Sequence, residues 1–408
     1  MAPSLKSRLA RLREASAPAP GKARGAAAGG PAPGSQAPVN SALAAALAER
    51  GWTSCGRGLW HRSLRFDPLP LGYEREPACL AGAVDAALGL PTGVAEATGG
   101  SPTAFDLETT GLSGGAGTVA FLAAFARPAE GGAVEVSQYF MDDYPAEPAF
   151  IAAVDEELAL AAPLISYNGS SFDLPLYRGR CVMNGVRPRL PSRAVDLLHT
   201  ARRLYKRSVG ECSLASIERA VLGMERGPDL PGALVPEAFF RYLREGYHDE
   251  LGLAMDHNAA DVRALLELYG VVRVLLARCL SGGAGSAASS AAGKAAPDPF
   301  GLAWLAARVD PRRSTELLEA ALAEGDERSV RPLMRRYWKE GRKDERLRLA
   351  PRLPDDAAGL LAKSLYAERV KEDRAEALRL AEKAQALGGP LAERAAARAA
   401  RLARRAGP

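Results

Sequence analysis

Two acidic residues separated by a single position are the first candidates for chemistry in this sequence. Asp106 and Glu108 lie in Thr103–Glu108, where Phe105 and Leu107 give the alternation typical of a strand. Side chains at positions i and i+2 of a strand share one face, so the two carboxylates would lie together while Leu107 points into the core. Paired carboxylates repel each other and are costly to desolvate unless a cation lies between them. Oxygen ligands of this kind suit Mg²⁺ or Mn²⁺, although two solvated residues on a sheet edge would give the same short pattern.

Two further carboxylates and one imidazole lie later in the chain. Asp173 ends the stretch LISYNGSSFD and is expected to open a helix, where the helix dipole alone would favour a carboxylate. Asp261 lies in HNAADVRALLEL, four residues after His257 and on the same helical face, a spacing that a plain surface pair also explains. Together the four carboxylates and the imidazole fall on a strand, a helix start and a final helix. This joint pattern is far more specific than any of its members.

Residues 101–280 show the rhythm of an α/β domain. Strands are expected over Thr103–Glu108, Val119–Ala126, Val134–Phe140, Leu164–Tyr167 and Arg193–Leu198. Helices are expected over Pro148–Ala161, Phe172–Asn184, Leu198–Lys206, Leu214–Leu222, Pro236–Glu245 and from about Met255 to Leu280. Short turns join the first three strands, which predicts an antiparallel meander.

Three motifs in this region resemble a known family. FDLETTGL, YNGSSFD and HNAADV are similar to the three motifs of the DEDD superfamily of 3′–5′ exonucleases, which have a ribonuclease H-like fold. The closer resemblance is to the bacterial YprB-type ribonuclease H-like proteins, through GLSGGAGTVAFL, DLLHTARRLYK, CSLASIERAVLGMER and the PEAFFRYL helix. The likeness covers roughly residues 55–280. It implies a mixed five-stranded sheet in the order 3-2-1-4-5 with helices on both faces.

The resemblance also implies roles for individual residues. Asp106, Glu108, Asp173 and Asp261 match four carboxylates that hold two divalent cations, Mg²⁺ or Mn²⁺, with Asp106 positioned to bridge both. His257 matches the group that takes a proton from the attacking water, although the superfamily places Tyr four residues and His five residues before the last Asp. This chain has His at the four-residue spacing and Asp256 at the five-residue spacing. A helix-surface histidine that only orients Asp261 is the alternative.

Substrate contacts are implied for the turn after the first strand. In the resembling exonucleases this turn meets the 3′-terminal nucleotide, and here it comprises Thr109, Thr110, Gly111 and Leu112. The Gly-rich residues 113–117 suit either a phosphate-binding nest or a tight hairpin turn. Asn168 is expected beside Asp173, as a substrate contact or as the first residue of an Asn-Gly turn. Residues 202–207 form a basic run that would track a nucleic-acid backbone or simply be a solvated helix face.

The remaining segments are assigned by composition. Residues 1–40 are expected to be a disordered basic tether, and residues 41–100 an extension that packs on the nuclease-like domain at 101–280. Residues 281–297 read as a flexible linker, and residues 298–408 as paired helices in a TPR-like, all-α region.

Charge varies along the 408 residues. Residues 1–50 carry seven Lys and Arg against two Asp and Glu, residues 51–297 carry 22 against 28, and residues 298–408 carry 24 against 18. Basic flanks around an acidic centre indicate ends that attract polyanions, although solubility explains such counts equally well. Five scattered cysteines without a Cys-x-x-Cys motif indicate free thiols in a reducing compartment. No secretory signal or membrane span is expected, so we expect a cytoplasmic protein.

The sequence therefore predicts a metal-dependent 3′–5′ exonuclease that hydrolyses phosphodiester bonds at the 3′ end of DNA or RNA. The alternative is a nucleic-acid-binding or scaffold protein whose helical region at 298–408 recruits a protein partner. Retention of four matched carboxylates favours the enzyme, because a pure binding protein does not need them.

Overall fold

The computed structural model describes residues 41–67, 78–91, 100–111, 117–227, 229–282 and 295–405. The expected tether at 1–40, Leu112, residues 113–116 and most of the expected linker lie outside these ranges. From Ser41 onward the chain forms one compact unit. None of the helices in the described ranges is long and apolar enough to cross a membrane.

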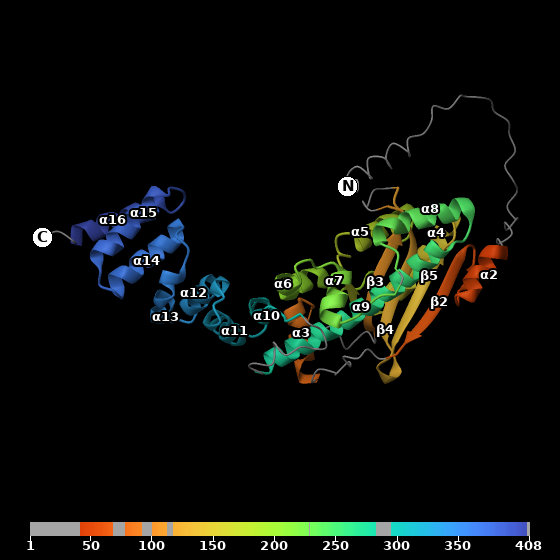
Figure 1. Ribbon diagram of the computed structural model, residues 1–408, viewed down its shortest axis with the longest axis horizontal. Coiled ribbons are helices and arrows are strands. Elements are labelled where there is room, and N and C mark those ends of the chain that lie inside the picture. Colours follow the sequence, from red (N-terminus) through yellow and green to blue (C-terminus); the bar gives the residue numbers. More distant parts are fainter. Residues whose placement is uncertain are drawn as a thin grey trace, which may run out of the picture. The chain divides into compact units, whose positions relative to one another are not determined.

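A mixed sheet is the centre of the fold (Figure 1). Its seven strands lie in the order β1-β2-β5-β4-β3-β6-β7 and are β1 (Thr53–Gly56), β2 (Leu59–Phe66), β3 (Ser101–Thr109), β4 (Ala120–Pro128), β5 (Val134–Met141), β6 (Ala161–Ser166) and β7 (Ala194–Asp196). Strands β3, β4 and β5 form the expected antiparallel meander, while β6 pairs parallel with β3 and β7 pairs parallel with β6. The expected order 3-2-1-4-5 is thus confirmed for the five strands from β3 to β7.

The sheet is wider than the expected five strands. Strand β2 pairs antiparallel with β5 along its whole length, from Leu59 opposite Met141 to Phe66 opposite Val134. Strand β1 adds a further antiparallel neighbour at the edge. The segment before residue 100 therefore contributes two strands to the same sheet. Trp60 of β2 and Trp52, which precedes β1, are buried in the same core as Phe105 and Phe140.

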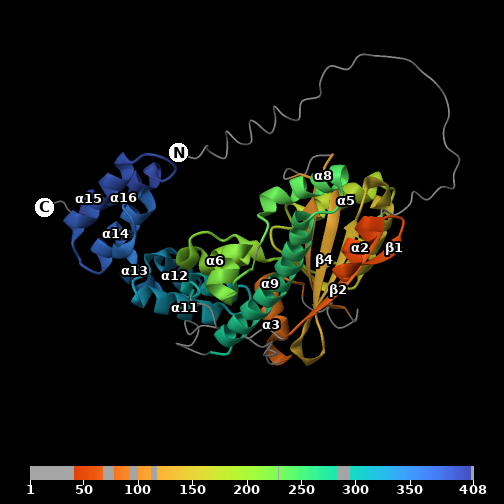
Figure 2. The ribbon, with the colours of Figure 1, turned by 45° about the vertical axis from the view of Figure 1, so that its right-hand side comes forward.

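Helices cover both faces of the sheet. They are α2 (Ser41–Glu49), α3 (Ala78–Leu88), α4 (Glu147–Ala159), α5 (Asp173–Met183), α6 (Leu197–Val209), α7 (Leu214–Ile217), α8 (Val235–Glu245) and α9 (Asp249–Leu280), with a π-helical turn, η3 (Glu218–Leu222), after α7. Helix α9 crosses the sheet and contacts β3, β4 and β5 (Figure 1 and Figure 2). Alternation along β3 separates two cores, with Ala104 in the one that holds the C-terminal half of α9 and Phe105 in the other.

Residues 295–405 are helical, as expected. The helices are α10 (Pro299–Ala306), α11 (Pro311–Ala323), α12 (Val330–Lys339), α13 (Lys343–Arg348), α14 (Ala357–Arg369), α15 (Arg374–Ala386) and α16 (Ala392–Arg405). Helix α10 buries Leu302 and Leu305 in the same core as the C-terminal half of α9. The amide of Ala295 donates to the carbonyl of Ala220, so the end of the expected linker is held against η3. The TPR-like character of this region stays a prediction.

Candidate active site

The predicted carboxylates lie at one edge of the sheet. Asp106 and Glu108 come near the C-terminal end of β3, and Asp173 is the first residue of α5, which follows β6. Because β3, β6 and β7 are parallel, their C-terminal ends meet at the same edge. In open α/β sheets this edge is the usual place for a ligand.

The start of α5 lies close to β3. Withdrawal from water raises the pKa of Asp173 to about 7, and the backbone N–H groups of Asp173 and of Leu107, the residue between Asp106 and Glu108, oppose that rise. The carboxyl of Asp173 therefore lies near the two carboxylates of the strand.

The electrostatics show that acids from three elements meet. Burial raises the pKa of Asp106 well above its ordinary value, and the charges of Asp173 and Asp261 raise it further. Burial raises the pKa of Glu108 as well, again with added repulsion from Asp261 and Asp173. Among the described residues no Lys or Arg forms an ion pair with Asp106, Glu108 or Asp173. Asp106, Glu108 and Asp173 therefore form an acidic group without an ion-pair partner among the described residues.

Asp261 is the one member of the set that has a cationic partner. The sequence predicted that this helix begins at about Met255, which would place Asp261 near its start. Helix α9 instead begins at Asp249, so Asp261 lies well inside it. The guanidinium of Arg226 donates through Nη2 to Asp261 Oδ1 and through Nε to Glu218 Oε2 at 2.6 Å. Burial lowers the pKa of Arg226, but the paired carboxylates outweigh it and raise that pKa overall. Glu218 is buried in η3, and burial raises its pKa while Arg226 opposes that rise.

His257 also lies in this cluster. Its Nε2 is 3.4 Å from Asp261 Oδ2, and its Nδ1 is 2.6 Å from Asp229 Oδ1 and 3.0 Å from Arg226 Nη1. The shorter contact with Asp229 favours a proton on Nδ1, which leaves the lone pair of a neutral ring on Nε2. His257 thus contacts Asp261, whose charge also acts on Asp106 and Glu108, and the roles of all five residues stay predictions.

Asp106 is held by a hydrogen-bonded chain of buried polar side chains that the sequence did not predict. Asn258 Nδ2 donates to Asp106 Oδ2 at 2.9 Å, and Gln138 Nε2 donates to Asn258 Oδ1 at 3.1 Å. Arg62 Nη2 in turn donates to Gln138 Oε1 at 2.6 Å. Arg62, Gln138 and Asn258 are all at most 4% exposed. This chain fixes which oxygen of Asp106 stays available at the edge of the sheet.

Cutting this chain at Asn258 should weaken the site more than the fold. We expect Asn258→Ala to lower any cation-dependent activity about 10–100-fold, as for other residues that orient a metal ligand. Because Gln138→Leu breaks the same chain, the double variant should lose little more than either single variant. The measurement is activity against Mn²⁺ concentration for the four proteins. Fully multiplicative losses would contradict a single connected chain.

Four of the predicted substrate contacts lie within the described residues: Thr109 ends β3, Thr110 and Gly111 follow it, and Asn168 follows β6. The hydroxyl of Thr109 donates to the carbonyl of Gly111 at 2.8 Å, and the hydroxyl of Thr110 accepts from the amide of Val119 at 2.9 Å. Both hydroxyls therefore hold the turn after β3. Asn168 has a φ of 68°, the left-handed conformation of a turn residue, which accords with the Asn-Gly turn interpretation.

Asp196, at the end of β7, holds the second turn in place. Its carboxylate accepts from the amides of Asn168 at 2.8 Å and Ser170 at 3.2 Å, and also caps α6 by accepting from Leu198 at 3.1 Å. The turn leads directly to Asp173, so Asp196 is a positioning residue for this carboxylate. The sequence places it in the quoted motif DLLHTARRLYK, but its contacts depend on the parallel pairing of β6 and β7.

The donor set suits divalent cations, with one rearrangement. Four carboxylates supply the oxygen ligands that Mg²⁺ and Mn²⁺ prefer, and a cation would relieve the repulsion that raises the pKa values of Asp106 and Glu108. Within the described ranges no three His, Cys, Asp or Glu side chains are already gathered closely enough to form a metal-binding group. Asp261 is paired with Arg226, so a cation held by Asp261 would have to compete with this ion pair.

A separate buried acid lies further along α9. Glu267 is 4% exposed, neither of its carboxyl oxygens has a hydrogen-bond partner among the described residues, and burial raises its pKa to about 7. The folded protein therefore keeps a proton on Glu267 that the unfolded chain releases above about pH 4.5. This proton therefore stabilises the folded state fully below about pH 4.5, and the stabilisation is lost as the pH rises through about 7.

Glu267→Gln should consequently stabilise the protein at alkaline pH. A neutral amide avoids the ionisation penalty, which corresponds to about 2–3 kcal/mol at pH 8 and to almost nothing near pH 4.5. Urea unfolding at pH 5 and pH 8 measures the difference, and Glu382→Gln on the exposed face of α15 serves as the control. An equal change at both pH values would show that Glu267 is not protonated in the fold.

Comparison with known proteins agrees with this architecture. Residues 103–273 match the RNase_H superfamily. Over 169 residues the chain is 38% identical to the uncharacterized protein YprB of Bacillus subtilis (strain 168), a match that covers 40% of this chain and 40% of that protein. The chain thus spans about two fifths of the length of the curated relative. Residues 103–273 thus form a ribonuclease H-like domain.

Proposed function

We propose that the chain is a divalent-cation-dependent 3′–5′ exonuclease that hydrolyses phosphodiester bonds of DNA or RNA. One observation carries the proposal. Asp106 and Glu108 of β3 are both repelled by Asp173 of α5 and by Asp261 of α9, so acids from three elements lie close together. A structural role does not require so much uncompensated charge at the ligand-binding edge of a sheet.

Asp106, Glu108, Asp173 and Asp261 would hold two cations, Mg²⁺ or Mn²⁺. When bound, such a pair supplies a more acidic attacking water, stabilisation of the leaving 3′ oxygen and neutralisation of the phosphate charge. The protein positions its own ligands through the neighbours described above. Asn258 orients Asp106, and Asp196 holds the turn that leads to Asp173.

His257 is the proposed proton acceptor. Nδ1 of His257 donates a hydrogen bond to Asp229. The lone pair of Nε2 is then available to take a proton from water at the Asp261 side of the site. A role limited to orienting Asp261 is the alternative interpretation, and Nε2 lies close enough to Asp261 for that role as well.

Exonucleolytic direction is proposed from the turn after β3. Because the Thr109 and Thr110 hydroxyls already hold this turn, its contacts with a terminal sugar would come mainly from backbone groups of Thr109, Thr110 and Gly111. Contacts by Leu112 and Asn168 stay predictions. Recruitment of a protein partner by residues 298–408 also stays a prediction.

The direct test uses single strands of DNA and RNA labelled at one end. With Mg²⁺ or Mn²⁺, a 3′ label should be released at once as a mononucleotide, whereas a 5′ label should pass through a ladder of shortening products. Asp106→Ala is the control. Equal mononucleotide release by wild type and Asp106→Ala on both nucleic acids would remove the enzyme proposal, and internal cuts in a closed circle would replace exonuclease with endonuclease.

A further inference from the structure

A basic helix face lies outside the site described above. Helix α6 carries His199, Arg202, Arg203, Lys206 and Arg207 at the spacing i, i+3, i+4, i+7 and i+8, which places all five on one face. The opposite face buries Leu197, Leu198, Ala201, Leu204 and Tyr205. The five basic residues line one side of a hollow of about 540 Å³, and Phe300 of α10 and Arg328 line the other.

The charge of this face is largely uncompensated. Asp298 is the single acidic residue in the lining, and both of its oxygens accept from Arg328, at 2.7 and 2.8 Å. Arg207 is 3.3 Å from Asp326, which Arg328 also contacts. Within the described chain Arg202, Arg203 and Lys206 have no carboxylate within 4.0 Å.

Aromatic rings hold two of the cations instead of carboxylates. The guanidinium of Arg203 lies 3.3 Å from the ring centroid of Trp304, and that of Arg328 lies 4.8 Å from the ring centroid of Phe300. A guanidinium that stacks on a ring keeps its charge and the N–H donors at its edge. Arg203 is therefore oriented and still free to donate a pair of hydrogen bonds to a phosphate.

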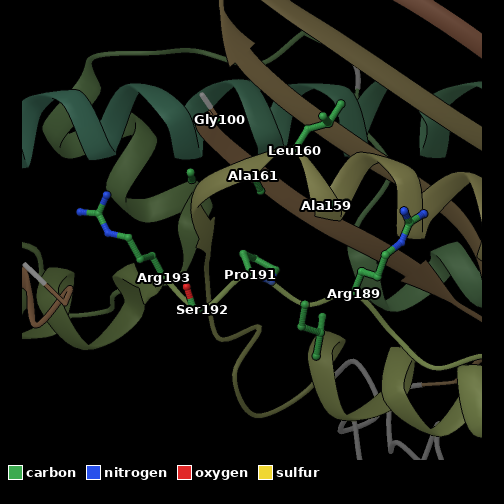
Figure 3. A pocket seen from close by; sticks show the side chains of 10 residues that line it. Gly100, Ala159, Leu160, Ala161, Arg189, Pro191, Ser192 and Arg193 are labelled. Carbon is green, nitrogen blue, oxygen red and sulfur yellow. The ribbon is translucent and has the colours of Figure 1, made fainter. Parts of the chain in front are cut away.

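A second hollow shows the contrast. It measures about 250 Å³ and is lined by Gly100, Ala161 and Ser192 among others, so it lies at the N-terminal ends of β3, β6 and β7, the edge opposite the carboxylates (Figure 3). Its two arginines are neutralised, because Arg189 pairs with Asp155 and Arg193 pairs with Asp85. The basic face of α6 differs from this ordinary surface in retaining its charge.

The place of α6 relates its basic face to the candidate active site. Asp196, which caps α6, also holds the turn that leads to Asp173. The basic face thus begins at the C-terminal edge of the sheet, and His199 to Lys206 extends for about 10 Å along the helix axis. A single strand of nucleic acid whose 3′ end lies among the carboxylates could continue along this basic face.

We propose that the basic face of α6, with Arg328 opposite it, binds the phosphate backbone of a single-stranded nucleic acid upstream of the scissile bond. This inference rests on the proposed nuclease function. Guanidinium groups without carboxylate partners bind phosphates in pairs of hydrogen bonds, and the positive charge compensates for the acidic site next to it.

The test measures binding of 5′-fluorescein-labelled (dT)20 and (rU)20 to the full chain in EDTA, by anisotropy at several salt concentrations. We expect Arg202→Gln/Lys206→Gln to bind at least 10-fold more weakly at low salt. The slope of log affinity against log salt should fall by about 1.4, which is ~0.7 for each lost contact on a single strand. Arg202→Lys, which keeps the charge, should retain most of the wild-type slope.

Arg335→Gln/Lys339→Gln is the matched control, because it removes two exposed basic residues at the same i, i+4 spacing from α12. Equal weakening by both double variants, or wild-type binding by the α6 variant, would overturn the proposal. Equal competition by polyglutamate at matched charge would also overturn it, in favour of an acidic protein segment.

Cleavage separates this inference from the function on which it rests. The α6 variant should lose kcat/KM on a 20-nucleotide strand but not on a dinucleotide, which is too short to reach α6. Absence of cleavage by wild type would refute the nuclease proposal alone, whereas unchanged kcat/KM of the α6 variant on the long strand would refute the α6 proposal alone.

Discussion

Asp106→Asn should make the chelated protein more stable at pH 8 and should remove the stabilisation that divalent cations bring. Asp106 has a pKa raised by burial and by Asp173 and Asp261, so the folded state resists its ionisation. Stability supplied by the bound proton is present at low pH and is lost as the pH rises through the ordinary carboxyl pKa and beyond. An amide removes this penalty and still accepts from Asn258 through its Oδ1.

The same substitution should abolish function. If Asp106 is the proposed ligand of both cations, its loss forfeits several kcal/mol of transition-state stabilisation, which corresponds to at least ~10³-fold in kcat. Thermal unfolding at pH 8 in EDTA and in Mn²⁺ measures the two stability effects. Wild type should gain about 2.7 kcal/mol at a cation concentration 100 times the Kd, and Asp106→Asn should gain much less.

Glu156→Gln, on the exposed surface of α4, is the control for removal of one negative charge. It should respond to Mn²⁺ as wild type does. If Asp106→Asn were less stable than wild type in EDTA at pH 8, the carboxylate would be a structural group and not an electrostatic burden.

Arg226→Met should cause the largest loss of stability. Removing this guanidinium leaves Glu218, which is 2% exposed, as a buried charge without its partner. Breaking a buried ion pair from one side typically costs about 3–5 kcal/mol. Equilibrium unfolding in urea at pH 7 is the measurement.

A second substitution separates the ion pair from simple packing. Glu218→Gln in the Arg226→Met background removes the stranded charge and should recover a large part of the loss, with a coupling energy of about 1–3 kcal/mol. Additive effects of the two substitutions would mean that Arg226 acts through its contacts with Asp229 and Asp261 and not through Glu218.

The sheet could be predicted from the sequence where local pattern and motif agreed. Alternation in Thr103–Glu108 places Asp106 and Glu108 on one face, and β3 has this alternation, with Leu107 buried on the other side. Strands β1 and β2 could not be predicted with the same certainty. Their position depends on long-range pairing with β5, and pairing register leaves no periodic signal in a single sequence.

The predicted site residues were those with chemistry at recognisable spacing. Gln138 gave a weaker signal. It is a polar residue at an inward position of a strand that otherwise buries Val134, Val136 and Phe140, which indicates a buried hydrogen bond. Asn258 likewise lies three residues before Asp261 on the same helix. Arg226 ends the quoted motif CSLASIERAVLGMER, but its role could not be predicted, because its contact with Asp261 exists only where the loop after η3 meets α9.

The most direct test of the central claim is diffraction from crystals soaked with Mn²⁺ and a nucleoside monophosphate, recorded where manganese scatters anomalously. The account predicts two manganese peaks among Asp106, Glu108, Asp173 and Asp261, with Asp106 between them and Asp261 released from Arg226. An anomalous map without manganese at Asp106, from a soak that saturates any cation-dependent activity, would contradict it.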